Sequence, residues 1–523
     1  MELISYRLLT LILFSPLLGA FVVMLVPGSQ KGTIRWTALL TSLVPLGLTI
    51  LLWARYSTSA GGFQFEERAS WYDAINSSYH LGVDGISVPM ILLTTLLVPL
   101  GILASFTIND RVKSYMALFL MLETGMLGVF MSLDLILFFL FWEIGLVPMY
   151  FLINIWGNPH GEREIGGQRV QARTYASFKF IVYTMAGSLG LLLAIQLIGI
   201  TAGTFDVLEL IEFWPAFDQE IFTRVPLSTV KAVAFWAFVI AFAIKVPVWP
   251  FHTWLPDAHT EAPTAGSMIL AGVMLKLGAY GLLRLVLPLF PVEAQAAAPL
   301  IALFAMLSIV LGALASYGQN DFKRLVAYSS VNHMGFVVLG IAVAARAYNV
   351  NSPDLQLSAT IAGAGAVLQM FNHGLSAAAM FFLVGVVYER VHTRDLNEIG
   401  GGIWQLAPVY GGILIFSAMS SLGLPGLNGF VSEFAVVRGS WPVFTRITTV
   451  SMLGLLFTGA YLLKGIQKVL HGPRNEKWAG LPMEISSREV IVMAPLMALM
   501  LIIGLWPWWI MNMINKTIVR LLG

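Results

Sequence analysis

The chain has 523 residues, of which 58% are hydrophobic and only 11% are charged. A soluble domain carries about 25% charged residues, so this composition excludes an ordinary soluble protein and indicates several membrane-spanning helices. The sequence contains no cysteine, which excludes disulfides, thiolate-bound zinc and cysteine-ligated iron–sulfur clusters. The net charge is only +2, which does not indicate the strongly basic surface of a nucleic-acid-binding protein, so no nucleic-acid partner is expected.

Apolar runs that are long enough to cross a bilayer recur along the whole chain. The first run has no clear cleavage site after it and is interpreted as a helix rather than a signal peptide. We therefore expect an all-α polytopic membrane protein with about fourteen transmembrane helices. The expected spans lie near residues 8–27, 36–54, 88–107, 114–131, 135–155, 176–200, 231–250, 263–287, 298–317, 324–344, 358–387, 405–437, 449–466 and 488–511.

Proline and glycine interrupt two of these spans, within residues 245–256 and 422–429. Lipid cannot satisfy the backbone groups that such breaks expose, so a broken helix must be buried in protein or line a wet cavity. Short loops between separate helices are the alternative interpretation. The density of proline and glycine favours two broken helices.

The two interrupted spans are the seventh and the twelfth, and this spacing suggests an internal repeat. Two consecutive units of five helices must run in opposite directions, which is the inverted-repeat arrangement of many transporters. We expect N-terminal helices 1–3 in residues 1–110 and a first repeat in 111–290. A second, inverted repeat is expected in 291–470, followed by a C-terminal helix 14 in 471–523.

Lysine and arginine are distributed unequally between alternate loops. One set of loops carries Lys31, Arg35, Arg111, Lys113, Arg163, Arg169, Arg173, Lys323, Arg324, Arg390, Arg394, Lys464, Lys468, Arg474 and Lys477. The opposite set carries Arg55, Arg68, Arg224, Arg346 and Arg446. Positively charged loops stay in the cytoplasm, so both termini are expected on the non-cytoplasmic side.

Several charged residues lie inside apolar spans, where each costs about 2.5–3.5 kcal/mol at a helix centre. Glu143 and Lys276 have no counter-charge within a turn or two, Lys245 precedes the first break, and Glu433 follows the second. Glu123 is a fifth candidate, in the fourth span. Burial brings lysine and glutamate side chains towards neutral pKa values, so these groups can exchange protons. The alternative is an inert ion pair, which stabilises little once desolvation is counted.

Four histidines are candidate proton relays. His333 and His373 lie in polar stretches of apolar spans, whereas His252 and His259 flank the first break. A histidine can accept a proton on one side and donate one on the other. Capping of a broken helix is the alternative role. No tight cluster of histidines and carboxylates is present in the sequence, so no metal site is expected.

Four segments carry a family resemblance: residues 81–87, 141–150, 245–263 and 422–433. They resemble the antiporter-like subunits of bacterial respiratory complex I, which is NADH-quinone oxidoreductase, and similarity covers nearly the whole chain. Mrp-type cation/proton antiporter subunits share much of this pattern. A length that suits fourteen helices favours the subunit M branch of the family. An acid at Glu433, where subunit L is expected to carry a lysine, favours the same branch.

The resemblance implies a role for each buried charge. Glu143 matches the glutamate of helix 5 and Lys245 its partner in helix 7. Lys276 matches the central lysine, His333 a central relay and Glu433 the terminal station. The implied activity is proton translocation, driven by electron transfer from NADH to quinone in other subunits. Those subunits would hold the FMN, the iron–sulfur clusters and the quinone, and this chain would need no cofactor.

The implied partners are other membrane-arm subunits, with antiporter-like neighbours on both sides, in the bacterial cytoplasmic membrane. An Mrp-type antiporter subunit and a scaffold that has lost pumping are the alternatives. The scaffold is disfavoured because none of the costly charges is missing. The loop 157–173 is longer and richer in glycine than the family pattern. Asp257 and Glu261 are expected to tie loops together or to contact a partner.

Overall fold

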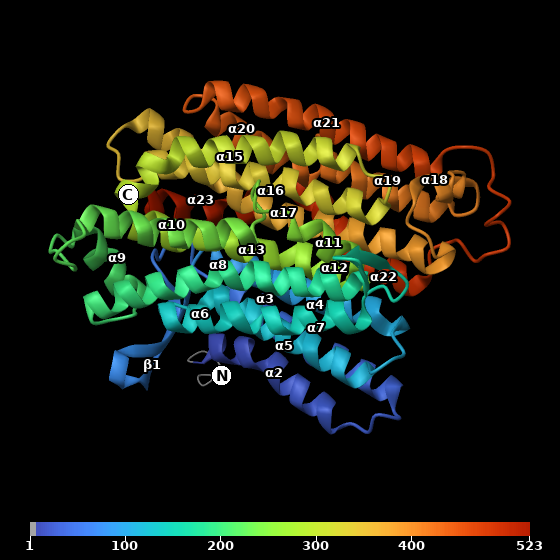
Figure 1. Ribbon diagram of the computed structural model, residues 1–523, viewed down its shortest axis with the longest axis horizontal. Coiled ribbons are helices and arrows are strands. Elements are labelled where there is room, and N and C mark those ends of the chain that lie inside the picture. Colours follow the sequence, from blue (N-terminus) through green and yellow to red (C-terminus); the bar gives the residue numbers. More distant parts are fainter. Residues whose placement is uncertain (1–6) are drawn as a thin grey trace.

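The computed structural model describes residues 7–523 as an elongated bundle whose long helices run roughly side by side (Figure 1). Thirteen helices of the described residues are long and apolar enough to cross a membrane. The shorter apolar helix α19 (Pro408–Leu422) is followed, after a break, by α20 (Asn428–Ser440). These two helices together make the remaining expected span, so the prediction of an all-α polytopic membrane protein is confirmed.

The elements of the first half are α2 (Leu8–Leu25), α3 (Lys31–Arg55), β1 (Gln64–Tyr72), η1 (Asp73–Ile75), β2 (Ser77–Val83), α4 (Ser87–Ala104), η2 (Ser105–Thr107), α5 (Val112–Met131), α6 (Leu135–Ile144), α7 (Leu146–Trp156), β3 (Glu162–Ile165), β4 (Gln168–Gln171), α8 (Ala172–Ala202), α9 (Val207–Ala216), α10 (Leu227–Lys245) and α11 (Trp254–Glu261). Those of the second half are α12 (Thr264–Ile269), η3 (Leu270–Met274), α13 (Leu275–Gly281), η4 (Leu282–Val286), α14 (Leu287–Leu289), α15 (Pro291–Tyr317), α16 (Phe322–Ala347), α17 (Pro353–Val391), α18 (Leu396–Ile399), η5 (Ile403–Gln405), α19, α20, α21 (Thr445–Leu470), α22 (Ser487–Leu505) and α23 (Trp508–Leu522).

The first break separates α10 from α11, where two prolines remove backbone donors from the helical ladder. Backbone groups freed at the break find partners in the protein. The amide of Trp249 donates to Ser308 Oγ at 2.9 Å, and Trp254 Nε1 donates to the carbonyl of Ile244 at 2.9 Å. This internal pairing is what a break at membrane depth requires. The break lies within the predicted interval 245–256, whereas the predicted span near 231–250 starts after and ends beyond the bounds of α10.

The second break lies between α19 and α20 and depends on glycine. Gly423 and Gly426 have φ angles of +81° and +95°, in the left-handed region that L side chains disfavour. The chain can therefore leave one helix and start the next within a few residues. The two breaks occur five spans apart in an up-and-down bundle, so the two broken helices run in opposite directions.

The eighth span, Thr264–Leu289, lies entirely inside the bundle. Two π-helical turns, η3 and η4, interrupt it on either side of Lys276. Such turns are rare and often mark functional sites. Nothing in the apolar pattern of the sequence predicted them, because a π turn changes the backbone bonding without changing residue types.

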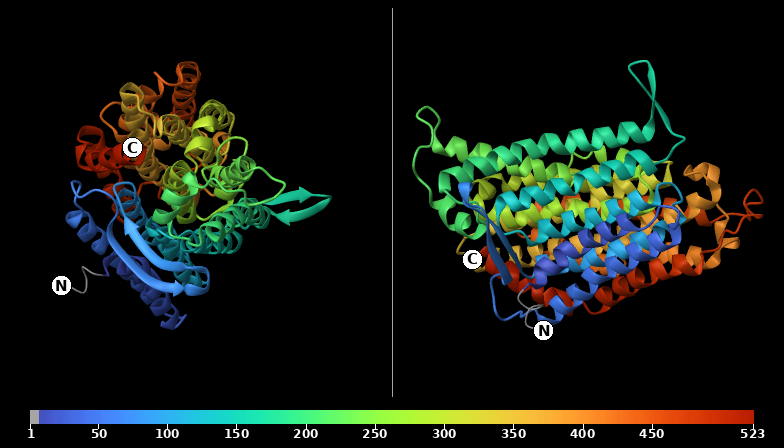
Figure 2. Two further views of the ribbon diagram at one scale, coloured as in Figure 1. Left: turned by 90° about the vertical axis from the view of Figure 1, so that its left-hand side faces the viewer. Right: turned by 90° about the horizontal axis from the view of Figure 1, so that it is seen from below.

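Two β-hairpins add to the helical body and were not predicted. Strands β1 and β2 pair antiparallel, as do β3 and β4. Figure 2 shows the β3–β4 hairpin, from the glycine-rich loop 157–173, extending away from the bundle. The predicted fourteenth helix near 488–511 was too long. It ends at Leu505, and α23 follows as a separate helix.

Candidate functional site

The side chain of Lys276 is buried at the centre of the bundle, in the helical piece between the two π turns. Its Nζ donates to the carbonyl of Ala271, which belongs to η3, and lies 2.8 Å from His373 Nδ1. The other ring nitrogen of His373 lies 3.2 Å from Ser330 Oγ. The central lysine and this histidine are thus in direct contact, although the sequence separates them by 97 positions.

A second polar group surrounds Glu433 in α20. The Oε1 atom of this carboxylate lies 2.8 Å from His333 Nδ1 and accepts a hydrogen bond of 2.9 Å from Gln369 Nε2. On the far side of the ring, Tyr461 Oη lies 3.2 Å from His333 Nε2. Glu433 is only 4% exposed, so the acid sits inside the protein.

The two groups meet at their histidines. The ring centroids of His333 and His373 are 5.6 Å apart, with the ring planes tilted by 40°. A single water molecule can bridge polar groups at such a separation. The titratable side chains of four helices, α13, α17, α16 and α20, therefore form a nearly continuous line, which consists of Lys276, His373, His333 and Glu433.

Glu143 and Lys245 lie near one another but do not form the expected direct ion pair. No bridge within 4.0 Å joins them among the described residues, although the charge of Glu143 acts on Lys245. Lys245 Nζ instead lies 4.9 Å from the centroid of the Trp142 ring and has no hydrogen-bond acceptor in the described chain. The side chain of Glu143 is half-buried and its Oε1 also lacks a partner there.

The other three candidates lie apart from this line. His259 is fully buried and stacks on Phe381 at 4.3 Å, with neither ring nitrogen bonded within the described residues. The half-buried ring of His252 lies 6.1 Å from that of Tyr328, in an edge-to-face contact. Glu123 is fully buried in α5, and neither carboxylate oxygen has a hydrogen-bond partner within residues 7–523.

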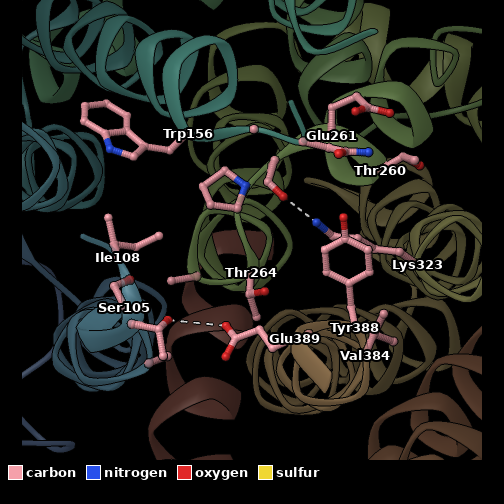
Figure 3. Close-up of a pocket in the computed structure, with 18 of the residues that line it drawn as sticks. Ser105, Ile108, Trp156, Thr260, Glu261, Thr264, Lys323, Val384, Tyr388 and Glu389 are labelled. Atoms are coloured by element: carbon pink, nitrogen blue, oxygen red, sulfur yellow. Dashed lines mark hydrogen bonds between the residues drawn. The ribbon is translucent and has the colours of Figure 1, made fainter. Parts of the chain in front are cut away.

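A pocket of about 170 Å³ lies at the end of the bundle where α11 turns into α12 (Figure 3). Its lining includes Glu261, whose Oε2 has no partner in the described chain, and Lys323, which donates to the carbonyl of Ala262. His259 lies close enough to Lys323 and Lys276 for both charges to act on it. The lining includes Thr260, the residue that follows the buried His259.

The sequence interpretation missed two buried charges. The charge pattern predicts Lys323 in a loop, but it lies in the first turn of α16 and is only 6% exposed. Arg284, also 6% exposed, lies in η4 and pairs with Asp84. Both residues sit near the ends of apolar runs, where a charge ordinarily reaches solvent. The expected role of Asp257 in tying loops is seen directly, because it forms ion pairs with Arg163 and Lys179.

A metal site has no support in residues 7–523, since no group of three or more His, Cys, Asp or Glu side chains converges there.

Two family models match the chain. The family described as NADH:quinone oxidoreductase/Mrp antiporter, transmembrane, matches residues 132–458. The amino-terminal family of NADH-ubiquinone oxidoreductase chain 4 matches residues 11–138.

Full-length relatives are similar in sequence. NADH-quinone oxidoreductase subunit M of Rhodobacter capsulatus is 38% identical, over 98% of this chain and 96% of the relative. The subunit M of Pseudomonas aeruginosa is also 38% identical, over 94% of this chain and 93% of the relative.

Solved structures share the fold. A chain of respiratory complex I from Thermus thermophilus has a TM-score of 0.82 at 24% identity and covers 98% of this chain and 100% of its own length. A chain of the Mrp complex from Dietzia has a TM-score of 0.82 at 20% identity, with 100% and 98% covered.

Proposed function

We propose that this chain, which belongs to the subunit M family of NADH-quinone oxidoreductase, moves protons along Lys276, His373, His333 and Glu433. The observation that carries the proposal is the line of contacts at the centre of the bundle. Lys276 Nζ lies 2.8 Å from His373 Nδ1, and His333 Nδ1 lies 2.8 Å from Glu433 Oε1. Each of these side chains can gain or lose a proton, which an inert ion pair does not need.

The steps follow from the chemistry of the groups. A proton on Lys276 passes to His373, which already contacts it, and Ser330 holds the second nitrogen of that ring. Transfer between the two histidines requires a bridging water or a ring rotation across the 5.6 Å between centroids. His333 then donates to Glu433, from which the proton leaves the bundle. The coupled groups titrate as a set.

Glu143 and Lys245 act on Lys276 through charge rather than by relaying protons. Lys245 lies near the Lys276 helix, because a Cβ built on Gly278 would lie 3.1 Å from Lys245 Cβ. Movement of Lys245 towards Glu143 removes positive charge from the neighbourhood of Lys276 and favours protonation of Lys276. Movement of Lys245 back towards Lys276 favours release of that proton. The half-buried position of Glu143 allows a neighbouring membrane-arm subunit to set this balance.

The pocket that Glu261 and Lys323 line is the proposed cytoplasmic approach to this line, because Thr260, the residue after the buried His259, also lines it. The pocket lies at the end that carries most of the lysine and arginine loops, and the charge bias of these loops supports a topology with both termini outside the cytoplasm. Electron transfer from NADH to quinone, with its FMN and iron–sulfur clusters, belongs to partner subunits. In this proposal the chain lies in the bacterial cytoplasmic membrane and has antiporter-like subunits as neighbours on both sides.

The test is Lys276→Ala in the assembled complex, with inside-out membrane vesicles that oxidise NADH in the presence of a pH-sensitive dye. Proton uptake is expected to be abolished or strongly reduced, while the amount of assembled complex stays close to that of the wild type. Lys516→Ala is the matched control, since this lysine is exposed on α23 and donates a hydrogen bond to Thr58 Oγ1 rather than to a residue of the line. Normal pumping by Lys276→Ala would remove Lys276 from the path.

Purification of the complex separates this function from that of an Mrp-type antiporter. Peripheral subunits with flavin and iron–sulfur clusters are expected to purify with the chain. A preparation that contains only membrane subunits and exchanges cations for protons without NADH would favour the antiporter.

A further inference from the structure

Arg284 is a buried positive charge that the proton line does not use. It lies in η4, eight residues beyond Lys276 on the same span, and is 6% exposed. Its guanidinium forms an ion pair with Asp84 and lies 4.7 Å from the centroid of the Phe63 ring. Arg284 Nε has no hydrogen-bond partner in the described chain. An arginine that is this buried and incompletely bonded is costly, so a specific role is required.

A chain of hydroxyl groups connects this ion pair to the Lys276 span. Tyr280, one turn beyond Lys276, places its Oη 3.1 Å from Ser87 Oγ. Ser87 Oγ in turn donates to Asp84 Oδ1 at 3.1 Å. Asp84 is the partner of Arg284. Polar groups therefore lead from Tyr280, one turn beyond the central lysine, towards the end of the bundle that carries the β1–β2 hairpin, without passing through Glu433.

This second line could let protons escape from a pump, because hydroxyl groups pass protons along a hydrogen-bonded chain, and Asp84 accepts a hydrogen bond from the last hydroxyl of the chain, Ser87. Glu433 lies on α20, whereas Tyr280, Ser87 and Asp84 lie on α13 and at the start of α4. A proton on Lys276 that escaped along the hydroxyl chain would bypass the controlled route, and one arriving from outside could run backwards. A pump with such a chain needs a block at its outer end.

We infer that Arg284, held by Asp84, is a charge barrier that closes the Tyr280–Ser87–Asp84 chain to protons. The inference rests on the proposed function, since it assumes that Lys276 carries protons. An arginine suits the task because it does not lose its proton in proteins, so it cannot become a link in the chain. A fixed positive charge at the end of a polar path repels an approaching proton, and channels exclude protons in this way.

The ion pair also fixes where the barrier stands. Asp84 accepts hydrogen bonds of 3.0 Å from the amides of Ile86 and Ser87, so its carboxylate is held at the start of α4. The amide of Gly85 donates to Thr517 Oγ1 at 3.1 Å, which ties the same turn to α23. The position of the barrier is therefore fixed by η4, by the turn at the start of α4 and by α23. It does not depend on the conformation of the long arginine side chain alone.

A purely structural tie is the competing explanation, and three variants of the assembled complex separate the two. Arg284→Met removes the positive charge. Asp84→Asn breaks the ion pair but keeps the positive charge of Arg284. The double variant removes both charges. Vesicles without NADH receive an imposed pH gradient, and its decay gives the passive proton leak. The barrier predicts a several-fold faster decay for Arg284→Met and for the double variant, and a wild-type decay for Asp84→Asn.

A structural tie predicts a different order. Asp84→Asn would leak as much as Arg284→Met, and the neutral double variant would recover; either result overturns the barrier. Should Arg284→Met fail to assemble, the contrast between Asp84→Asn and the double variant still decides. Adding Lys276→Ala to the leaking variant is expected to restore a slow decay. A leak that persists in this combined variant would overturn the route through Lys276. The proposed function is tested separately, by the pumping activity of Lys276→Ala alone.

Discussion

His333 Nδ1 lies 2.8 Å from Glu433 Oε1, and this contact joins two helices whose residues are 100 positions apart. The carboxylate would be an expensive isolated charge at this depth. The histidine supplies a partner that can itself bind or release the proton, and Gln369 fixes the orientation of the carboxylate through Oε1. The pair therefore joins two buried groups that can each bind or release a proton, which an arginine partner at Glu433 would not provide.

Glu433→Gln keeps the shape of the side chain and its capacity for hydrogen bonds but cannot release a proton. Pumping by the assembled complex is expected to fall to less than about a tenth, since groups that transfer protons contribute about 10²–10⁴-fold in rate. Glu433→Asp should retain part of the activity. Dye-monitored proton uptake per NADH oxidised measures the effect, and wild-type pumping by Glu433→Gln would exclude Glu433 as a station.

The pair of His80 and Asp206 should make the β1–β2 hairpin sensitive to pH. His80 Nδ1 lies 2.7 Å from Asp206 Oδ2. Burial alone would lower the pKa of His80, but the hydrogen bond and the charge of Asp206 raise it above the ordinary value. Burial alone would raise the pKa of Asp206, but its contacts with His80 lower it.

The signs of these shifts define a window of stability. The contribution of His80 is fully present below its ordinary pKa of about 6.5 and is lost as the pH rises through the raised pKa. That of Asp206 is present above its ordinary pKa of about 3.9 and is lost as the pH falls through the lowered pKa. Between pH values of about 3.9 and 6.5, the stability contributions of His80 and Asp206 are therefore both present. Within this pH window, the backbone amides of residues 64–83 should exchange hydrogen faster in His80→Gln than in the wild type. In alkaline buffer, where His80 no longer contributes, this difference in exchange rate should shrink.

Gly278 allows α13 to approach α10 beside Lys245. A Cβ at this position would lie 2.6 Å from the carbonyl oxygen of Phe242, which is backbone and cannot move away easily. Gly278→Ala is therefore expected to destabilise the subunit by about 1–3 kcal/mol, as overpacking of a core does. The amount of assembled complex that survives heating measures this. Gly47→Ala is the control, because nothing lies within 4 Å of the added Cβ; equal losses in both variants would contradict the close approach.

Much of the fold was predictable because the apolar runs and the proline and glycine breaks are local features of the sequence. Lys276 and Glu433 were also identifiable, since a charge in the middle of an apolar run has no local explanation. Arg284 was not, because it lies near the end of its run and its partner Asp84 is far away in the sequence. The contact between Lys276 and His373 was equally hidden, because the packing of helices decides which buried groups meet.

Lys245 separates function from stability better than the other buried charges do. Its Nζ has no hydrogen-bond acceptor in the described chain and lies over the face of Trp142, 4.9 Å from the ring centroid. Replacing an incompletely paired buried charge by an apolar side chain of similar volume is often neutral or stabilising. Lys245→Met should therefore assemble at least as well as the wild type, yet pump far fewer protons per NADH. Native electrophoresis and dye-monitored uptake measure the two quantities, and wild-type pumping at wild-type abundance would show that Lys245 has no part in translocation.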